Sequence, residues 1–173
     1  EAEKKPVFLR KLIRKFSRKK NQLKHGVYIW GDVGRGKSML MDLFYDNLTT
    51  KRKRRVHFHE FMLEFHNMLQ QWRDEHSNSK KSADPIPKLA KRIAKQYQVL
   101  CFDELQVNNI ADAMLLGRLF TLLLENGVFI IMTSNRIPDD LYKDGLQREN
   151  FLPFIKLIHT QMEVFQLNHF LDY

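Results

Sequence analysis

Residues 31–38 read GDVGRGKS, in which three glycines are followed by a lysine and a serine at the spacing of a phosphate-binding loop. Glycines let the backbone curl tightly enough for its N–H groups to face a phosphate, at the positive end of the helix that follows. In such a loop Lys37 reaches the β and γ phosphates, and the Ser38 hydroxyl ligates Mg²⁺. The alternative is an ordinary glycine-rich turn between a strand and a helix. The pattern favours a site for ATP or ADP with Mg²⁺, formed by Gly31, Asp32, Val33, Gly34, Arg35, Gly36, Lys37, Ser38 and Met39.

Two adjacent carboxylates, Asp103 and Glu104, follow the four apolar residues 99–102. This is the Walker B pattern, in which the first carboxylate holds Mg²⁺ and the second polarises the water that attacks the γ phosphate. A buried strand that ends in a solvated acidic turn would look similar. Because a phosphate-binding loop precedes it, we expect Asp103 to be a metal ligand and Glu104 to be catalytic.

Asn135 follows another apolar run, residues 128–133. A polar residue at the carboxyl end of such a strand lies at the rim of an open parallel sheet, where nucleotides bind. We expect Asn135 to orient the attacking water or to sense the γ phosphate. The alternative is a plain turn residue.

Alternating strands and helices must position these residues. Strands that are apolar on both faces and are separated by helices are typical of a parallel sheet with helices on both sides, so the expected fold class is α/β. We expect strands at 27–30, 56–61, 99–102, 128–133 and 163–167. Helices are expected at 39–47, 61–73, 88–96, 110–125 and 151–160, with a further helix start at 138–141 and a surface loop at 76–87.

The net charge of +9 belongs mostly to one end of the chain. Residues 1–25 hold ten Lys/Arg and two Glu, which leaves nineteen Lys/Arg against eighteen Asp/Glu for the rest. The basic pI therefore does not indicate nucleic-acid binding by the body of the chain. Residues 6–20 form a basic amphipathic pattern, which predicts a helix packed on its own domain, a helix on a membrane surface or anionic partner, or a nucleic-acid contact.

Two further clusters have an unremarkable interpretation that we favour. The five consecutive cations at 51–55 could touch phosphates, but we expect a solvated loop at the mouth of the second strand. His57, His59 and His66 have no further ligand at a closing spacing, so we expect packing or hydrogen bonding rather than a metal site.

The length of 173 residues suits one domain with a substantial core, which we expect over residues 26–173, after a basic helix and link at 1–25. The single cysteine, Cys101, lies in an apolar run, which predicts a buried thiol and a reducing, intracellular compartment. No apolar run approaches the length of a membrane span. Because the chain begins at Glu1 and ends directly after a strand-like run, we expect a piece of a longer protein.

Together these segments resemble the ZapE-like family of AAA+ P-loop ATPases, which occurs in bacteria and in mitochondria. The resemblance covers roughly residues 26–173, and the histidine-containing second strand and the Gly-Leu-Gln-Arg turn are its most specific parts. The matching segments are 31–44, 55–62, 101–104, 110–114, 133–136, 138–142 and 145–148.

The resemblance implies the AAA+ sheet order 5-1-4-3-2 and ATP hydrolysis between neighbouring subunits of a homo-oligomer. Arg148, in the turn before the last helix, is then the expected arginine finger, with Arg136 or a salt bridge of Arg148 within its own subunit as alternatives. The implied work is remodelling of a protein client, either a division-ring protein in the bacterial cytoplasm or an inner-membrane protein in the mitochondrial matrix. A DNA-associated ATPase of helicase-loader type and a non-hydrolysing scaffold are the other readings.

The chain departs from the family pattern at three points. Leu105 stands where relatives usually have Phe, and Asn109 stands where they usually have Asp, so the resemblance assigns no role to that acidic position here. Relatives also continue into a helical lid that supplies a further arginine. We therefore expect the lid to be absent and the turnover of this piece to be poor.

Overall fold

The computed structural model describes residues 24–77 and 84–167. The helix expected at 6–20 lies outside them. The described strands are β1 (Gly26–Trp30), β2 (Lys53–His57), β3 (Val99–Asp103), β4 (Phe129–Ser134) and β5 (Met162–Gln166). The helices are α2 (Lys37–Asn47), α3 (Phe58–Glu75), α4 (Pro85–Gln96), α5 (Ile110–Glu125) and α6 (Leu152–Gln161), with short 3₁₀ helices η1 (Pro138–Asp140) and η2 (Arg148–Asn150).

The strands form one parallel sheet in the order β2-β3-β4-β1-β5. Read from the other edge this is the expected order 5-1-4-3-2, so the α/β fold class and the topology are both confirmed. In this register Trp30 lies opposite Ser134, and His57 lies opposite Asp103. The last residues of β1, β2, β3 and β4 therefore meet at one edge of the sheet, which is where parallel α/β sheets bind ligands.

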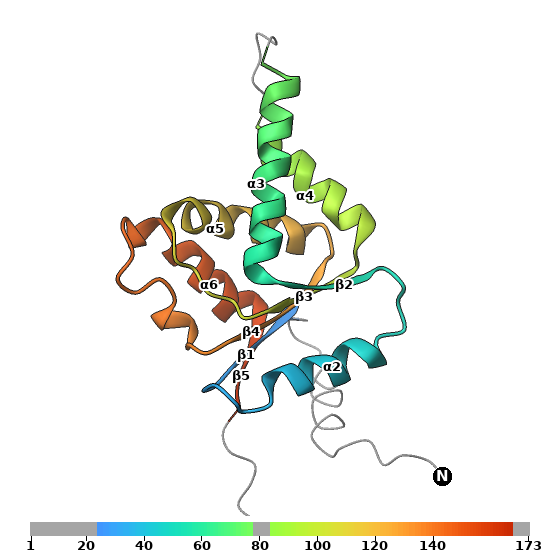
Figure 1. Cartoon of the computed structure of the whole chain (residues 1–173), viewed down its shortest axis with the longest axis vertical. Helices are drawn as coiled ribbons and strands as arrows, with labels where there is room; N and C mark the ends of the chain where they lie inside the picture. The colour runs from blue at the N-terminus through green and yellow to red at the C-terminus, as the bar shows by residue number, and fades with distance from the viewer. Residues whose placement is uncertain (1–23, 78–83, 168–173) are drawn as a thin grey trace, which may run out of the picture.

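The helices cover the two faces of the sheet unequally. Among the described helices, α2 alone packs on one face, while α3 to α6 cover the other, and Figure 1 shows this division. The larger side has a core of interlocking phenylalanines, with Phe61 and Phe102 ring centroids 4.8 Å apart and Phe120 and Phe154 centroids 5.3 Å apart, both edge to face. Such pairs add to the stability that their burial alone supplies.

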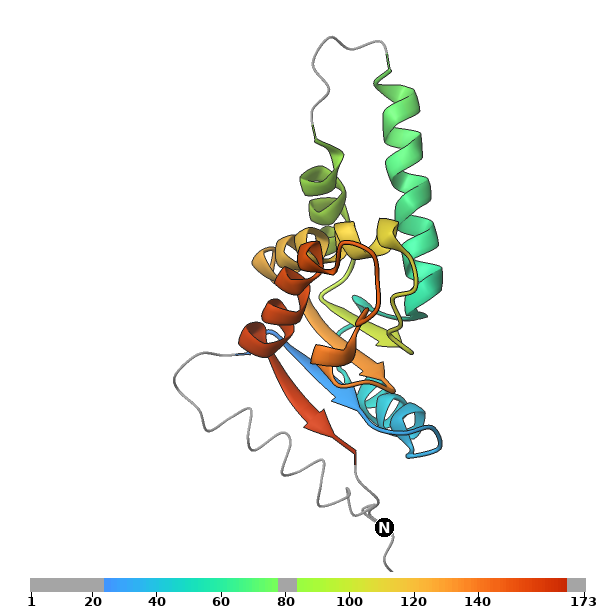
Figure 2. The same ribbon diagram turned by 90° about the vertical axis from the view of Figure 1, so that its left-hand side faces the viewer.

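The longest described helix is α3, with 18 residues, and Figure 2 shows it projecting beyond the sheet. Its buried residues Phe58, Phe61, Met62, Phe65 and Leu69 recur at helical spacing, and the rest of its surface is mostly polar, with Leu63 an exposed exception. Across the part of the chain that the structure describes, no helix combines the length and the apolar character that a bilayer crossing requires.

The prediction for residues 51–61 was wrong in two respects. The second strand is Lys53–His57 rather than 56–61, and Phe58 already belongs to α3. The expectation of a solvated loop holds for Lys51 and Arg52, which lie exposed before β2, but not for the other three cations. Lys53 donates to the carbonyls of Tyr45 and Leu48, and Arg54 makes two hydrogen bonds to Glu64, at 2.6 and 2.8 Å. A charged strand is stable here because β2 is an edge strand, whose long side chains can reach partners on both faces.

The other element boundaries lie within three residues of the predicted ones, and those of α5 coincide with them. Helix α4 begins at Pro85 instead of Lys88, because the Asp84 carboxylate accepts a hydrogen bond from the N–H of Ile86 and caps the helix. Asn109 caps α5 in the same way, accepting from the N–H of Asp112 at 2.8 Å. The hydrogen bonding expected for His66 is confirmed, since its Nε2 lies 2.7 Å from the buried carboxylate of Asp112.

Candidate nucleotide-binding site

The loop between β1 and α2 has the backbone that a phosphate-binding loop needs. Gly34 and Gly36 adopt left-handed conformations, with φ of 78° and 79°, and Gly36 is the residue directly before α2. At Gly31 the chain passes so close to Leu167, the residue after β5, that an added Cβ would lie 2.7 Å from its carbonyl oxygen. These conformations place the loop at the positive end of α2, where N–H groups can face an anion.

Lys37 lies across this loop. Its amine donates to the carbonyls of Gly31 and Asp32, at 2.6 and 2.7 Å. Burial lowers the pKa of Lys37, while the carboxylates of Asp32 and Glu104 act in the opposite direction. The ammonium group of the loop is therefore within electrostatic range of the second Walker B carboxylate.

Asp103 ends β3 and is buried. Arg55 donates from Nε to Oδ2 of Asp103 at 2.6 Å, and one terminal nitrogen of the same guanidinium lies 3.3 Å from Oδ1. The other terminal nitrogen of Arg55 pairs with Asp42 on α2. The hydrogen bonds to Asp103 raise the pKa of Arg55 above its usual range. Sequence reasoning missed this arginine because it placed residues 51–55 in a loop.

Glu104 is held in an unusual backbone conformation. Its φ is 56°, a left-handed value that costs a non-glycine residue roughly 1–2 kcal/mol. Its N–H donates to the Thr133 hydroxyl at 3.1 Å, and the N–H of Leu105 donates to the Thr133 carbonyl at 2.7 Å. The Ser134 hydroxyl donates to the Leu105 carbonyl at 2.9 Å. These bonds from β4 keep the Glu104 side chain exposed at the edge of the sheet.

Asn135 directly follows β4 and is exposed. The N–H of Gly31 donates to the carbonyl of Ser134 at 3.2 Å, so Asn135 lies next to the start of the phosphate-binding loop. The Tyr28 hydroxyl donates to the carbonyl of Arg136 at 2.7 Å, and burial raises the pKa of that phenol. The segment after β4 is thus tied to β1 and β3. The supporting roles of Thr133, Ser134 and Tyr28 were not predicted from the sequence.

The expected finger residue lies on a separate turn. Arg148 begins η2, which packs against α5 and α6, and its terminal nitrogen donates to the carbonyl of Asp139 at 2.6 Å. Within residues 24–77 and 84–167, its Nε is buried without a hydrogen-bond partner. The Arg136 side chain donates to the carbonyl of Asp140, at 3.4 Å. A finger role for either arginine requires a second subunit and stays a prediction.

The donor set suits a magnesium ion. Ser38 is exposed in the first turn of α2, and Asp103 ends β3, the strand against which α2 packs. Hydroxyl and carboxylate oxygens are the ligands that a hard divalent cation prefers, in company with phosphate oxygens and water. These two residues would hold the ion, which would neutralise charge on the phosphates.

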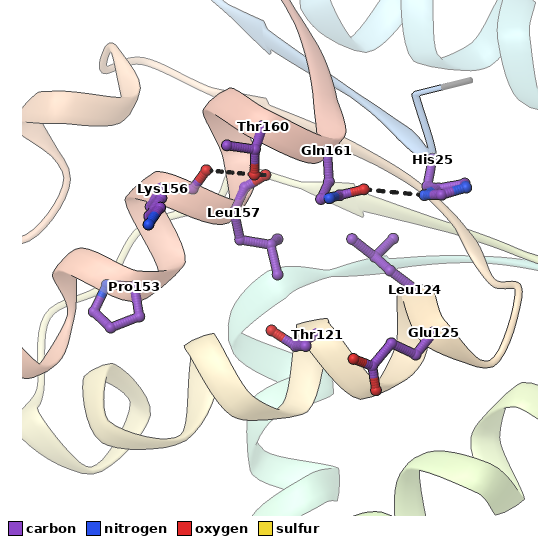
Figure 3. Close-up of a pocket in the computed structure, with 9 residues that line it drawn as sticks. All are labelled: His25, Thr121, Leu124, Glu125, Pro153, Lys156, Leu157, Thr160 and Gln161. Carbon is purple, nitrogen blue, oxygen red and sulfur yellow. Dashed lines mark hydrogen bonds between the residues drawn. The ribbon is translucent and has the colours of Figure 1, made fainter. Parts of the chain in front are cut away.

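A separate pocket of about 310 Å³ lies between α5 and α6, and Figure 3 shows its lining. His25 and Gln161, whose side chains are 3.2 Å apart, precede β1 and β5. This pocket therefore lies at the amino ends of the strands, at the opposite edge of the sheet from the phosphate-binding loop. It takes no part in the candidate site.

Comparison with known proteins agrees with this geometry. A sequence model of the AFG1-like ATPases matches residues 1–173. The chain is 46% identical over 174 residues to an uncharacterised protein of Schizosaccharomyces pombe, covering 94% of this chain and 38% of that protein. It is 44% identical over 159 residues to the cell division protein ZapE of Escherichia coli, covering 90% of this chain and 40% of that protein.

Among solved structures, domain III of the replication initiation protein DnaA from Thermotoga maritima superposes with a TM-score of 0.60 at 17% identity. The match covers 95% of this chain and 64% of that one, and at this identity it shows the fold alone. The chain spans less than half the length of the two curated relatives. With a matching family model, 44–46% identity to these relatives and a P-loop core of the expected strand order, the chain belongs to the AFG1-like ATPase family.

Proposed function

We propose that this chain binds Mg-ATP at the carboxyl edge of β1, β3 and β4 and hydrolyses it. The observation that carries the proposal is the meeting of two motifs: the phosphate-binding loop leads from β1 into α2, and Glu104 follows β3 at the same edge of the parallel sheet. An ordinary glycine-rich turn and an ordinary acidic strand end would have no reason to occur together at one edge of the sheet, whereas a nucleotide site needs both.

The proposed roles follow from this placement. The loop N–H groups and Lys37 bind the β and γ phosphates, while Ser38 and Asp103 hold the magnesium ion. Glu104 polarises the attacking water, and Asn135 orients that water or senses the γ phosphate. Lys37 donates to the carbonyls of Gly31 and Asp32, and the third N–H of its ammonium group is available to a phosphate.

The hydrolysis step is tested by Glu104→Gln, which keeps the size and removes the charge. Phosphate release is expected to fall to background, while ATP binding stays within about threefold of wild type, because the phosphate ligands are untouched. Glu149→Gln, an exposed carboxylate of η2, is the matched control and is expected to retain turnover. A wild-type chain that binds ATP but releases no phosphate in an assembled state would contradict hydrolysis and favour the scaffold reading.

We further propose that hydrolysis takes place between subunits of a homo-oligomer and drives remodelling of a protein client. Exposed apolar side chains support an assembly, since Val33 and Met39 at the phosphate-binding loop are 82% and 65% exposed, and Leu146 beside Arg148 is 75% exposed. Contacts between these two sites on neighbouring subunits would remove them from water. Leu146→Asp is expected to weaken self-association in sedimentation velocity, whereas unchanged association would contradict this interface.

The proposed client is a division-ring protein or an inner-membrane protein. The Escherichia coli relative is named a cell division protein, and this name supports the first choice. The corresponding compartments are the bacterial cytoplasm and the mitochondrial matrix. Both are compatible with the buried free thiol of Cys101. A peripheral membrane contact through residues 6–20 stays a prediction, because that segment lies outside the described residues.

A further inference from the structure

Arg55 lies between two carboxylates that belong to different elements. Its Nε and one terminal nitrogen contact both oxygens of Asp103 on β3, and its other terminal nitrogen pairs with Asp42 on α2. Contact with both oxygens is the fork geometry in which arginine binds a carboxylate most strongly. The carboxylate expected to bind metal is therefore already engaged by a cation of the protein.

The strand pattern of β2 explains why Arg55 reaches this place. In the parallel register Arg55 lies opposite Cys101, whose side chain packs in the cluster beneath α2. Arg55 therefore points to the face that α2 covers, and Asp103, two residues beyond Cys101, lies on that face as well. The neighbouring Arg54 points to the opposite face and pairs with Glu64 of α3.

The two partners of Arg55 depend on it differently. The Asp103 side chain is 11% exposed, whereas the Asp42 side chain is 57% exposed. A carboxylate without a partner is costly when buried and well solvated when exposed. Asp103 thus needs a cation at all times, and Asp42 does not.

We propose that Arg55 is a positioning residue that holds the Asp103 carboxylate while no nucleotide is bound and releases it to the metal of the Mg-nucleotide. This inference rests on the proposed function, because it takes Asp103 as a metal ligand. The guanidinium and the metal compete for the same carboxylate oxygens. Asp42 provides a second anchor, so Arg55 can leave Asp103 without losing every anionic partner. Arg55 therefore sets the metal affinity of the site, and Asp42 sets how readily Arg55 leaves.

The proposed competition for Asp103 is tested by titrating the full chain with Mn²⁺ in the presence of a non-hydrolysable ATP analogue. Binding is measured as the loss of the EPR signal of free Mn²⁺. Arg55→Met is expected to bind Mn²⁺ roughly three- to thirtyfold more tightly than wild type, because the competitor is gone. The metal-free variant is expected to unfold at a lower temperature, because Asp103 is left buried and unpaired. Arg54→Met removes the same charge from the other face of β2 and is the matched control, with unchanged Mn²⁺ affinity.

Asp42→Asn is expected to act in the opposite direction and weaken Mn²⁺ binding, because Arg55 then has Asp103 as its main anion. In a double-mutant cycle, Asp42→Asn is expected to have no further effect once Arg55→Met is present. If the effects of Arg55→Met and Asp42→Asn on Mn²⁺ affinity add up, the charges of Arg55 and Asp42 act on the metal only through their separate electrostatic fields. That result would overturn the proposal. Arg55→Met binding Mn²⁺ no more tightly than wild type would overturn it as well.

Two controls separate misfolding, and failure of the proposed function, from failure of this inference. If Arg55→Met does not fold, Arg55→Lys takes its place, because a compact ammonium cannot hold both oxygens of Asp103 in a fork. The same signs with smaller magnitudes are expected, and Asp42→Asn should have a smaller effect than in wild type, because the ammonium can still pair with one carboxylate oxygen. A wild-type chain that binds no Mn²⁺-nucleotide overturns the proposed function together with this inference, whereas normal wild-type binding with a failed cycle overturns this inference alone.

Discussion

The N–H of Glu104 donates a hydrogen bond to the hydroxyl of Thr133, which ties the end of β3 to β4 at the point where Glu104 takes a left-handed conformation. The Thr133 side chain is buried, whereas Glu104 itself is exposed, and the bond between them is partly buried. A strained residue persists only where its surroundings fix it. Thr133 is therefore part of what orients the proposed catalytic carboxylate.

Thr133→Val is expected to lower the turnover more than the ATP affinity. The substitution keeps the shape of the side chain but leaves the N–H of Glu104 without its acceptor, at a cost of about 1–3 kcal/mol in the free energy of unfolding. Thr121→Val is the control, because its hydroxyl bonds to its own helix at Gly117, on the pocket side of the molecule. Equal losses of turnover in the two variants, measured by phosphate release, would contradict the orienting role.

Gly36→Ala and Gly127→Ala form a matched pair. Both glycines have positive φ, 79° and 82°, and an added Cβ has no neighbour closer than 3.8 Å at Gly36 and none within 4 Å at Gly127. Each variant is expected to lose about 1–2 kcal/mol of stability through backbone strain. Gly36→Ala should also weaken ATP binding, because the loop N–H groups relax away from the phosphates. If thermal shift and fluorescence titration show equal ATP affinity in both variants, the loop does not bind phosphate in this conformation.

Arg148→Ala tests the finger assignment. In an assembled sample the turnover is expected to fall roughly 10³- to 10⁵-fold, while ATP binding remains. Mixing Arg148→Ala with Lys37→Ala subunits is expected to restore part of the activity, because some interfaces then combine an intact loop with an intact finger. Full turnover in Arg148→Ala together with its loss in Arg136→Ala would transfer the role to Arg136.

The reactivity of Cys101 tests whether β3 is buried inside the sheet. Its side chain is 0% exposed, and burial raises the pKa of the thiol to about 12. At pH 8 the native thiol is therefore neutral and inaccessible, and a disulfide reagent should label it only at the rate at which the protein unfolds. The labelling rate should rise in parallel with the unfolding seen by circular dichroism. Rapid labelling of the folded chain would contradict the interior position of β3, between β2 and β4.

Much of the fold was predictable because its signals are local. The strand, glycine loop and helix around Lys37, and the apolar run before Asp103, lie within single segments, and the resemblance supplied the strand order. The β2–α3 boundary was missed although a signal was present, since Phe58, Phe61, Phe65 and Leu69 already recur at helical spacing from residue 58. The apolar and aromatic character of residues 56–61 was given too much weight as a signal for a strand.

The environment of the site was predictable only in part, because it depends on contacts between distant segments. Arg55 is 13 residues from Asp42 and 48 residues from Asp103 in the sequence. The local run of five cations therefore predicts exposure to solvent and gives no sign of these ion pairs. Thr133 and Glu104 are likewise 29 residues apart. Such partners follow from the parallel register, which sets a strand beside another that lies far away in the sequence.

Calorimetric titration of the folded chain with Mg-ATP tests the central claim most directly. Wild type is expected to bind one nucleotide per chain with an affinity that depends on magnesium, and Lys37→Ala, with an unchanged circular dichroism spectrum, is expected to lose most of that heat. A folded wild-type chain that shows no magnesium-dependent binding of ATP would contradict the account at its foundation.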